Sequence, residues 1–326
     1  MADTNRAPRM TQPPHPFAPR EDLAAPQGHT TPGHPFAELV EVYTRDFLPM
    51  KAPVTQYNER LLLRRFAEHL GPIPLANLSP LVLRSWFASF PAWYKPGTVR
   101  RYRTMLSAVL TAAVQKYEWL EKHPLRKVAQ PPRPLDRERC LEADELTRLL
   151  QACQGNVNPH LYLVVVLALS TGARKNEILQ RTWGDLDLER GTLRLSRTKN
   201  GRRRPVPLVG PVLPLLRQQA ERYGSRRWVF PRADGRKPVL IDYAWRRART
   251  LAEIEDLHFH DLRHTAASYL ALSGASLRDI AEILGHTNLE QTMKYTHLME
   301  PHTRGVLQRM IAQHLGGALE AEEPRR

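Results

Sequence analysis

Hydrophobic residues recur at three- and four-residue intervals near the start of the chain, which is the spacing of amphipathic helices. The stretches 36–47, 61–70, 75–90 and 98–114 follow this spacing. Ser79-Pro80 begins one of them, because serine can cap a helix and proline suits the first helical position. We therefore expect an all-helical domain over residues 35–127.

The hydrophobic pattern then changes period and later changes back. Helices are predicted over 142–153 and 161–169, the second ending at Gly172. The short hydrophobic runs that follow predict β-strands, and Asn200-Gly201 between two of them is a strong signal for a β-hairpin. These strands are expected at 185–188, 192–196 and 203–208, before helical spacing returns from Pro211 to Leu315. The predicted fold is mainly α with a small antiparallel β-sheet: a helical first domain and a mixed α/β second domain.

Proline-rich and polar segments mark the expected domain boundaries. Residues 1–34 contain too few apolar groups to offset the entropy of ordering. The run Gln130-Pro131-Pro132-Arg133-Pro134 cannot continue a helix and reads as an extended linker. The expected organisation is a flexible arm at 1–34, a helical domain at 35–127, a linker at 128–137, a second domain at 138–315 and a tail at 316–326.

The charge of the chain points to a polyanionic partner. The 326 residues include 48 Lys and Arg against 33 Asp and Glu, which gives a net charge of +15 and a pI near 10.2. An acidic small molecule would hardly explain such an excess, whereas nucleic acid would.

Cysteine usage and hydropathy indicate a cytoplasmic protein. Cys140 and Cys153 are too few for a disulfide framework and too far apart for a metal knuckle, as is typical of a reducing compartment. The longest apolar run, 161–169, is far shorter than the ~20 residues that span a bilayer. We expect no membrane segment.

Polar residues of the second domain form four short motifs, each a weak signal by itself. In chain order they are Thr171-Gly172-Ala173-Arg174 with Glu177, Lys199 on the Asn-Gly hairpin, His260-Asp261-Leu262-Arg263-His264, and Leu284-Gly285-His286 followed by Tyr295. Together, their order and spacing resemble the tyrosine recombinase family, also called phage-type integrases, over residues 137–300. The helical first domain is similar to the core-binding domain of that family.

The resemblance implies a site-specific DNA recombinase, which cuts DNA through a tyrosine that becomes linked to the 3′ phosphate. Negative charge gathers on the non-bridging phosphate oxygens in such a transition state. Guanidinium groups suit this charge because each donates two parallel hydrogen bonds, and Arg174 and Arg263 match the two arginines of the family. The resemblance implies no cofactor and no metal, since the phosphotyrosine conserves the bond energy.

The resemblance also assigns roles to the remaining motif residues. Tyr295 is the nucleophile, and His260 assists its proton transfer, a task suited to an imidazole. His286 hydrogen-bonds the phosphate, and Lys199 protonates the leaving 5′ oxygen. Glu177 holds the site in shape without touching DNA.

The surroundings of Tyr295 predict an accessible phenol. Polar residues flank it on both sides, and it is expected on a helix that begins around Asn288. Free tyrosine has a pKa of about 10, so neighbouring cations must stabilise the phenolate. His258 and His264 compete with His260 for its role, and His264 is expected to be structural.

Further basic residues are candidates for contact with the DNA backbone. Arg202 and Arg203 follow Lys199 on the hairpin. In the first domain, cations crowd the start of a helix, where they oppose the helix macrodipole, and phosphate contact would explain that placement. These residues are Lys95, Arg100, Arg101 and Arg103.

The resemblance further implies double-stranded DNA as partner and a homo- or hetero-tetramer on paired sites. A two-domain chain with a short arm looks most like the Xer-type resolvases, whose task is chromosome partition at the nucleoid, and integration or excision stays open. An amphipathic helix at 303–314 is expected to dock on a neighbouring protomer or on its own domain.

Two other functions agree with parts of the sequence. His260 and His264 are four residues apart, like the ligand pair of zinc hydrolases, with Asp261 in place of the usual Glu. Arg263 opposes this reading because it adds a fixed cation in the same turn. The other function is a DNA-bridging protein of the same fold without catalysis.

Overall fold

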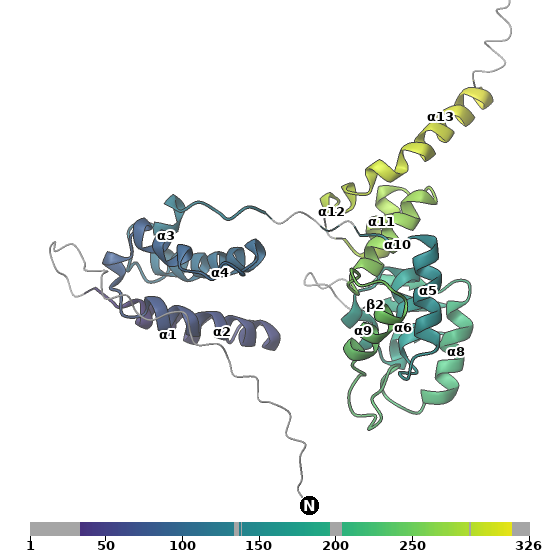
Figure 1. Ribbon diagram of the computed structural model, residues 1–326, viewed down its shortest axis with the longest axis horizontal. Helices are drawn as coiled ribbons and strands as arrows, with labels where there is room; N and C mark the ends of the chain where they lie inside the picture. The colour runs from purple at the N-terminus through teal and green to yellow at the C-terminus, as the bar shows by residue number, and fades with distance from the viewer. Residues whose placement is uncertain (1–32, 134–136, 138, 196–203, 287, 315–326) are drawn as a thin grey trace, which may run out of the picture. The chain divides into compact units, whose positions relative to one another are not determined.

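A computed structural model of the chain describes residues 33–133, 137, 139–195, 204–286 and 288–314 (Figure 1). The chain divides into two compact units, residues 1–136 and 137–326. The described residues are mainly helical and contain one three-stranded antiparallel sheet, which confirms the predicted fold class. The helix Glu300–His314 and the other described helices are too short or too polar to span a membrane.

The first unit is built from four α-helices around an apolar core. They are α1 (Phe36–Phe47), α2 (Pro53–Leu70), α3 (Pro80–Ala88) and α4 (Pro96–Gln115), with 3-10 turns η1 (Leu75–Asn77) and η2 (Pro124–Lys127). Ser79 caps α3 as predicted, its Oγ accepting from the Val82 amide at 3.3 Å. Phe66 and Leu106 are fully buried at the centre of the core.

Part of the expected linker belongs to the first unit. Val128 is buried in its core next to Leu125. The Arg103 guanidinium donates to the carbonyl oxygens of both residues, at 3.0 Å from Leu125 and 2.8 Å from Val128. Arg100 donates to the Pro131 carbonyl at 2.7 Å. The segment therefore stays attached to α4 as far as residue 131, beyond the expected boundary at 127.

The second unit surrounds the almost wholly apolar helix α6 (Leu161–Thr171). Helices α5 (Ala143–Gln154), α8 (Val212–Tyr223) and α10 (Asp261–Leu272) pack against it. The remaining elements before the C-terminal helices are α7 (Lys175–Leu179), η3 (Trp183–Asp185) and α9 (Asp242–Leu251).

The sheet has the order β1 (Leu186–Asp187), β2 (Thr192–Leu195) and β3 (Arg204–Pro207). Leu193 pairs with Val206, and both side chains are buried against the core. Residues 196–203 between β2 and β3 are outside the described residues, so Lys199, Arg202 and Arg203 are too.

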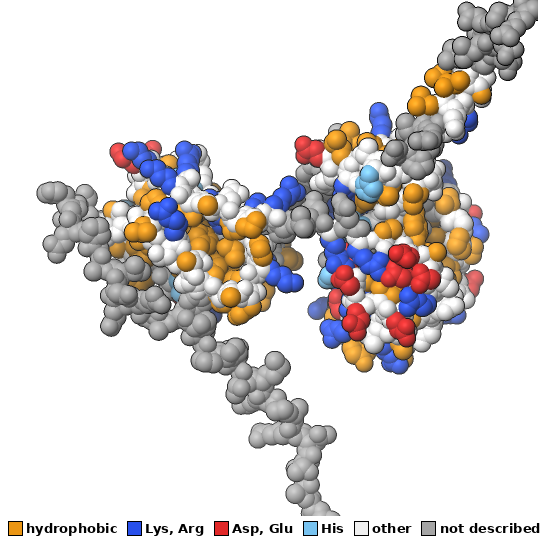
Figure 2. Space-filling view, turned by 45° about the horizontal axis from the view of Figure 1, so that its top comes forward, with side chains coloured by type: hydrophobic (Ala, Val, Ile, Leu, Met, Phe, Trp, Pro, Cys, Tyr) orange, Lys and Arg blue, Asp and Glu red, His pale blue; other side chains and the backbone are white. Residues whose placement is uncertain are grey.

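The last four elements of the described residues are α11 (Leu277–Leu284), α12 (Glu290–Met293), η4 (Thr296–Met299) and α13 (Glu300–His314). Ser276 and Asp279 form the expected capping box of α11, and Gly285 ends that helix with φ +69°. Hydrophobic side chains stand exposed along α13 (Figure 2). The predicted helix at 303–314 is confirmed.

Candidate active site

The turn between α6 and α7 positions the first arginine. Gly172 has φ +60°, and a Cβ there would lie 2.3 Å from Leu284 Cδ2, so glycine is needed for both reasons. Arg174 follows and precedes the first turn of α7. Glu177 accepts from the Arg174 amide at 3.0 Å and from its Nη1 at 2.9 Å. The acid thus fixes both the backbone and the guanidinium of Arg174.

Arg263 projects from α10 into the interior near the same turn. It is only 4% exposed, and its Nη1 donates to the Gly172 carbonyl at 2.7 Å. Its Nη2 is buried without a hydrogen-bond partner. Burial, together with the charges of Arg174 and Arg204, lowers the pKa of Arg263 to about 9, which leaves it charged at neutral pH. The two arginines of the motif therefore lie close enough for their charges to interact.

The two histidines of the motif, His260 and His286, lie near these cations, which favour their uncharged form. His260 immediately precedes α10 and is exposed, yet partial desolvation and the charges of Arg263 and Arg174 lower its pKa. His286 follows Gly285, and its Nδ1 lies 2.7 Å from the Thr292 hydroxyl. Burial and the charges of Arg263 and Arg174 lower the pKa of His286 to about 3.

Tyr295 differs from the sequence expectation in place and exposure. It follows α12 instead of lying on it, because α12 ends at Met293. The side chain is 5% exposed and packs with Ala267 and Leu284, so the prediction of an accessible phenol was wrong. Polar neighbours in sequence did not reveal this, because the chain leaves the helix there and turns the ring inward.

The phenol of Tyr295 forms a hydrogen bond with His264, the histidine that was expected to be structural. The Tyr295 oxygen lies 2.8 Å from His264 Nδ1, and Lys294 Nζ lies 3.0 Å from the same nitrogen. Burial and the Lys294 charge lower the pKa of His264 to about 4. His264 is therefore neutral at physiological pH, and its Nδ1 lies within hydrogen-bond distance of both the Tyr295 hydroxyl and the Lys294 ammonium.

Sequence reasoning left three contributors without a role in the site: His264 was expected to be structural, and Lys294 and Arg204 were not assigned. His264 lies one helical turn after His260, with ring centroids 5.3 Å apart, and that spacing was an available signal. Lys294 precedes Tyr295 directly. Arg204 lies at the start of β3, and no signal separated it from Arg202 and Arg203 because the hairpin register was not known.

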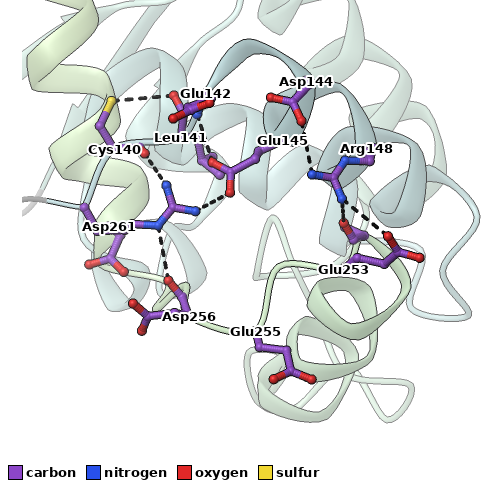
Figure 3. A network of polar contacts seen from close by, with 12 residues as sticks. Cys140, Leu141, Glu142, Asp144, Glu145, Arg148, Glu253, Glu255, Asp256 and Asp261 are labelled. Carbon is purple, nitrogen blue, oxygen red and sulfur yellow. Dashed lines mark hydrogen bonds and ion pairs between the residues drawn. The ribbon is translucent and has the colours of Figure 1, made fainter.

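The first residues of the second unit are fastened to the helix that carries His260 and Arg263. Arg137 Nε donates to both carboxylate oxygens of the buried Asp261, at 3.0 and 2.9 Å. Arg139 donates to Glu145 and to the Cys140 and Asp256 carbonyls, and these acceptors lie close together in Figure 3. Arg137 thereby holds the first residue of α10 in place.

The same contacts bear on the zinc hydrolase reading. Asp261, the residue required to imitate the catalytic Glu, is already bonded to Arg137 and to the His258 amide at 2.7 Å. Within the described ranges, no group of three or more His, Cys, Asp or Glu could hold a metal ion. The residues present do not fit that alternative.

The basic residues of the first unit separate into two kinds. Lys95 and Arg101 are exposed at the start of α4 and stay candidates for phosphate contact. Arg103 is only partly exposed, and its donors serve the Leu125 and Val128 carbonyls. Arg100 likewise holds Pro131. Arg103 and Arg100 therefore have a structural use that their position near a helix start did not reveal.

The site defines a class of protein: arginines and histidines from four separate elements gather near a tyrosine, as a phosphodiester-cleaving enzyme requires. Residues 139–302 match the phage integrase family. The chain belongs to this family.

Individual relatives extend the comparison. The chain is 34% identical over 226 residues to the integrase of Salmonella phage P22, covering 64% of this chain and 56% of that protein. It is 31% identical to tyrosine recombinase XerC of Xanthomonas campestris, covering 66% of this chain and 67% of the relative. The chain thus spans little more than half the length of the P22 integrase.

The fold is shared with a solved structure. The Tn1549 transposon integrase, solved in complex with circular intermediate DNA, aligns with a TM-score of 0.70 at 18% identity. The alignment covers 81% of this chain and 95% of that one. At this identity the likeness concerns the fold alone.

Proposed function

We propose that this protein is a site-specific DNA recombinase that cleaves and rejoins duplex DNA through a 3′-phosphotyrosine at Tyr295. The observation that carries the proposal is Arg263: a buried guanidinium with one free nitrogen, Nη2, next to Arg174 and the neutral His260 and His286. A buried cation with an unused donor is suited to an anionic phosphate.

The proposed chemistry combines these groups with Lys199, which lies outside the described residues. Arg174 and Arg263 donate to the non-bridging phosphate oxygens while the Tyr295 oxygen forms a bond to phosphorus. The bond to the 5′ oxygen breaks, and that oxygen takes a proton from Lys199. His260 assists removal of the phenol proton. Rejoining reverses the exchange: a 5′ hydroxyl attacks the phosphotyrosine, and the phenol recovers its proton.

Cleavage requires the phenol to leave its present hydrogen bond. Tyr295 is buried and hydrogen-bonded to His264, so its oxygen must leave that hydrogen bond before it attacks phosphorus, and His260 then assists removal of its proton. We propose that DNA in the site draws the segment after α12 toward the phosphate. This step makes cleavage dependent on a correctly bound duplex.

Assembly and location extend the proposal. We propose that the protein works on DNA in the cytoplasm, at the nucleoid, as a tetramer on paired sites. The apolar residues exposed on α13, among them Leu307 at 52% and Ile311 at 44%, supply a surface for protomer contact. Either resolution, as in Xer-type proteins, or integration and excision would use the same cleavage chemistry.

The burial of Tyr295 favours a second candidate, a DNA-bridging protein without catalysis. The two functions differ in one product, a covalent protein–DNA adduct. Genomic DNA of the source organism incubated with the protein yields candidate sites, because adducts survive denaturation and can be sequenced. A nicked duplex built on a captured site then traps the adduct, since the freed end is lost and cannot rejoin.

The wild-type protein is expected to form this adduct, and Tyr295→Phe is expected to bind the duplex without forming it. Excess chelator should leave the reaction unchanged. Binding of the captured DNA without any adduct would support the bridging function instead.

A further inference from the structure

Arg204, the first residue of β3, reaches the site from an element that the sequence motifs do not include. Its side chain is 13% exposed. Its Nη1 donates to the Leu284 carbonyl at 2.6 Å, which joins β3 to the end of α11. Its Nη2 lies 3.8 Å from Glu177 Oε2, which is too long for a hydrogen bond but close enough for attraction.

The guanidinium lies against the turn that presents His286. A Cβ added to Gly285 would lie 2.0 Å from Arg204 Nη1, so the arginine occupies the space that a side chain at 285 would need. Gly285 also has φ +69°, which favours glycine. The arginine and the glycine are therefore a matched pair that sets where His286 begins.

The charge of Arg204 is not balanced locally. Arg174, Arg204 and Arg263 all face Glu177, and one carboxylate cannot neutralise three guanidiniums. Nε and Nη2 of Arg204, like Nη2 of Arg263, are buried without a hydrogen-bond partner. Burying such a charge is costly unless something compensates it. The missing compensation points to an anion that occupies the site during function.

The field of Arg204 reaches the residues of the proposed reaction. Its charge contributes to the lowered pKa of Arg263 and of His286, although burial is the larger cause for each. Burial also lowers the pKa of Arg204 itself. Arg204 is thus electrically coupled to the phosphate ligands on α10 and after α11.

We propose that Arg204 is a positioning residue of the phosphate site, which fixes the Gly285–His286 turn and adds a buried positive charge that the DNA phosphate balances. This inference rests on the proposed function, because it takes the scissile phosphate as the missing anion. If Arg204 had only a structural role, it would need its hydrogen bond to the Leu284 carbonyl but not its positive charge.

Two substitutions separate charge from hydrogen bonding. Arg204→Gln removes the charge and keeps a side-chain N–H donor at the position of the arginine Nε. Arg204→Lys keeps the charge and loses the planar fork. Arg222→Gln is the matched control, because Arg222 is an exposed arginine in the last turn of α8. Each folded variant is assayed for the single-turnover rate of adduct formation on the nicked duplex.

The expected result is a rate loss of about 10- to 100-fold for Arg204→Gln, by comparison with removal of one preorganised charge-stabilising group. Arg204→Lys should keep most of the rate, and Arg222→Gln should match wild type. The same assay on DNA with a methylphosphonate at the scissile position, which lacks one negative charge, should shrink the defect of Arg204→Gln. Thermal unfolding checks that each variant is folded.

Several results would overturn the inference while wild type still forms the adduct. They are wild-type rates for Arg204→Gln, equal losses for Gln and Lys, or a Gln defect of the same size on charged and neutral phosphates. If Arg204→Gln does not fold, a folded Arg204→Lys that has lost the rate overturns it as well. Absence of the adduct from wild type would instead overturn the proposed function, and this inference with it.

Discussion

At the scale of single residues, the site contains cationic side chains that hydrogen bonds within the protein already hold in a fixed orientation. Arg263 uses one nitrogen to hold the Gly172 carbonyl and keeps another without a partner. Glu177 orients Arg174 through two hydrogen bonds. Groups fixed in this way do not need to reorganise when charge develops on a phosphate, and that is the main source of electrostatic catalysis.

Arg174→Ala tests this preorganisation, because Arg174 is the more exposed of the two motif arginines and its loss leaves the core intact. We expect the rate of adduct formation to fall by about 10²- to 10³-fold with little change in DNA affinity. Single-turnover kinetics and a binding titration measure the two effects. Lys175→Ala, which removes the neighbouring cation on α7, is the control, and a similar loss in both variants would contradict the assignment.

Two partly buried histidines make a second prediction at this scale. The pKa values of His264 and His286 are lowered to about 4 and about 3 in the folded protein. The unfolded chain therefore binds more protons below its ordinary histidine pKa of about 6.5, so stability is full above that pH and falls as the pH drops toward 4.

We expect the Tm of the protein to be several degrees lower at pH 5 than at pH 7.5, measured by circular dichroism. His286→Asn should show a smaller difference between the two pH values, because one of the depressed groups is absent. An equal or higher wild-type Tm at pH 5 would contradict the lowered pKa values of these histidines.

At the scale of elements, helix ends and tight turns position the site. Gly172 ends α6 before Arg174, and Gly285 ends α11 before His286. His260 stands at the start of α10, one turn before His264. Arg174, His260 and His286 therefore lie beside helix termini, where the backbone direction changes and side chains from different elements can converge.

Gly285→Ala tests the importance of one such terminus. Gly210→Ala is a matched control, because Gly210 has a similar φ of +62° but nothing within 4 Å of an added Cβ. Both substitutions strain the backbone by about 1–3 kcal/mol. Only Gly285→Ala also displaces Arg204, so it should lower the free energy of unfolding by more than the control in a urea titration. Equal losses would indicate that the close approach of Arg204 does not matter.

The sequence predicted these elements well where local chemistry determines them. The capping box at Ser276, the helix stop at Gly285 and the strand pair around Leu193 follow from residues that are close in sequence. The environment of Tyr295 was not predicted, because it depends on packing against α10 and α11. The use of Arg103 was missed for the same reason, since its acceptors lie more than 20 residues further along the chain.

At the scale of the whole molecule, each unit has its own core, and basic side chains are exposed on both (Figure 2). Lys95 and Arg101 are exposed in the first unit, whereas Arg103 stabilises it. If both units contact one duplex, affinity depends on the release of counterions from the DNA. The net charge of +15 is then a means of binding and not of folding.

The double substitution Lys95→Ala with Arg101→Ala should weaken DNA binding and reduce the slope of log K against log salt by about 2, near 0.9 per lost phosphate contact. Fluorescence anisotropy over a range of salt concentrations measures this slope. Arg103→Ala is expected to lower the Tm and leave the slope close to wild type. An unchanged slope in the double variant would remove these two residues from the interface.

The most direct test of the account is to identify the amino acid that becomes attached to DNA. The adduct trapped on a nicked duplex is digested with protease and nuclease, and the modified peptide is sequenced by mass spectrometry. The account predicts a nucleotide joined through its 3′ phosphate to Tyr295. A nucleotide on any other residue, or one joined through a 5′ phosphate, would contradict it.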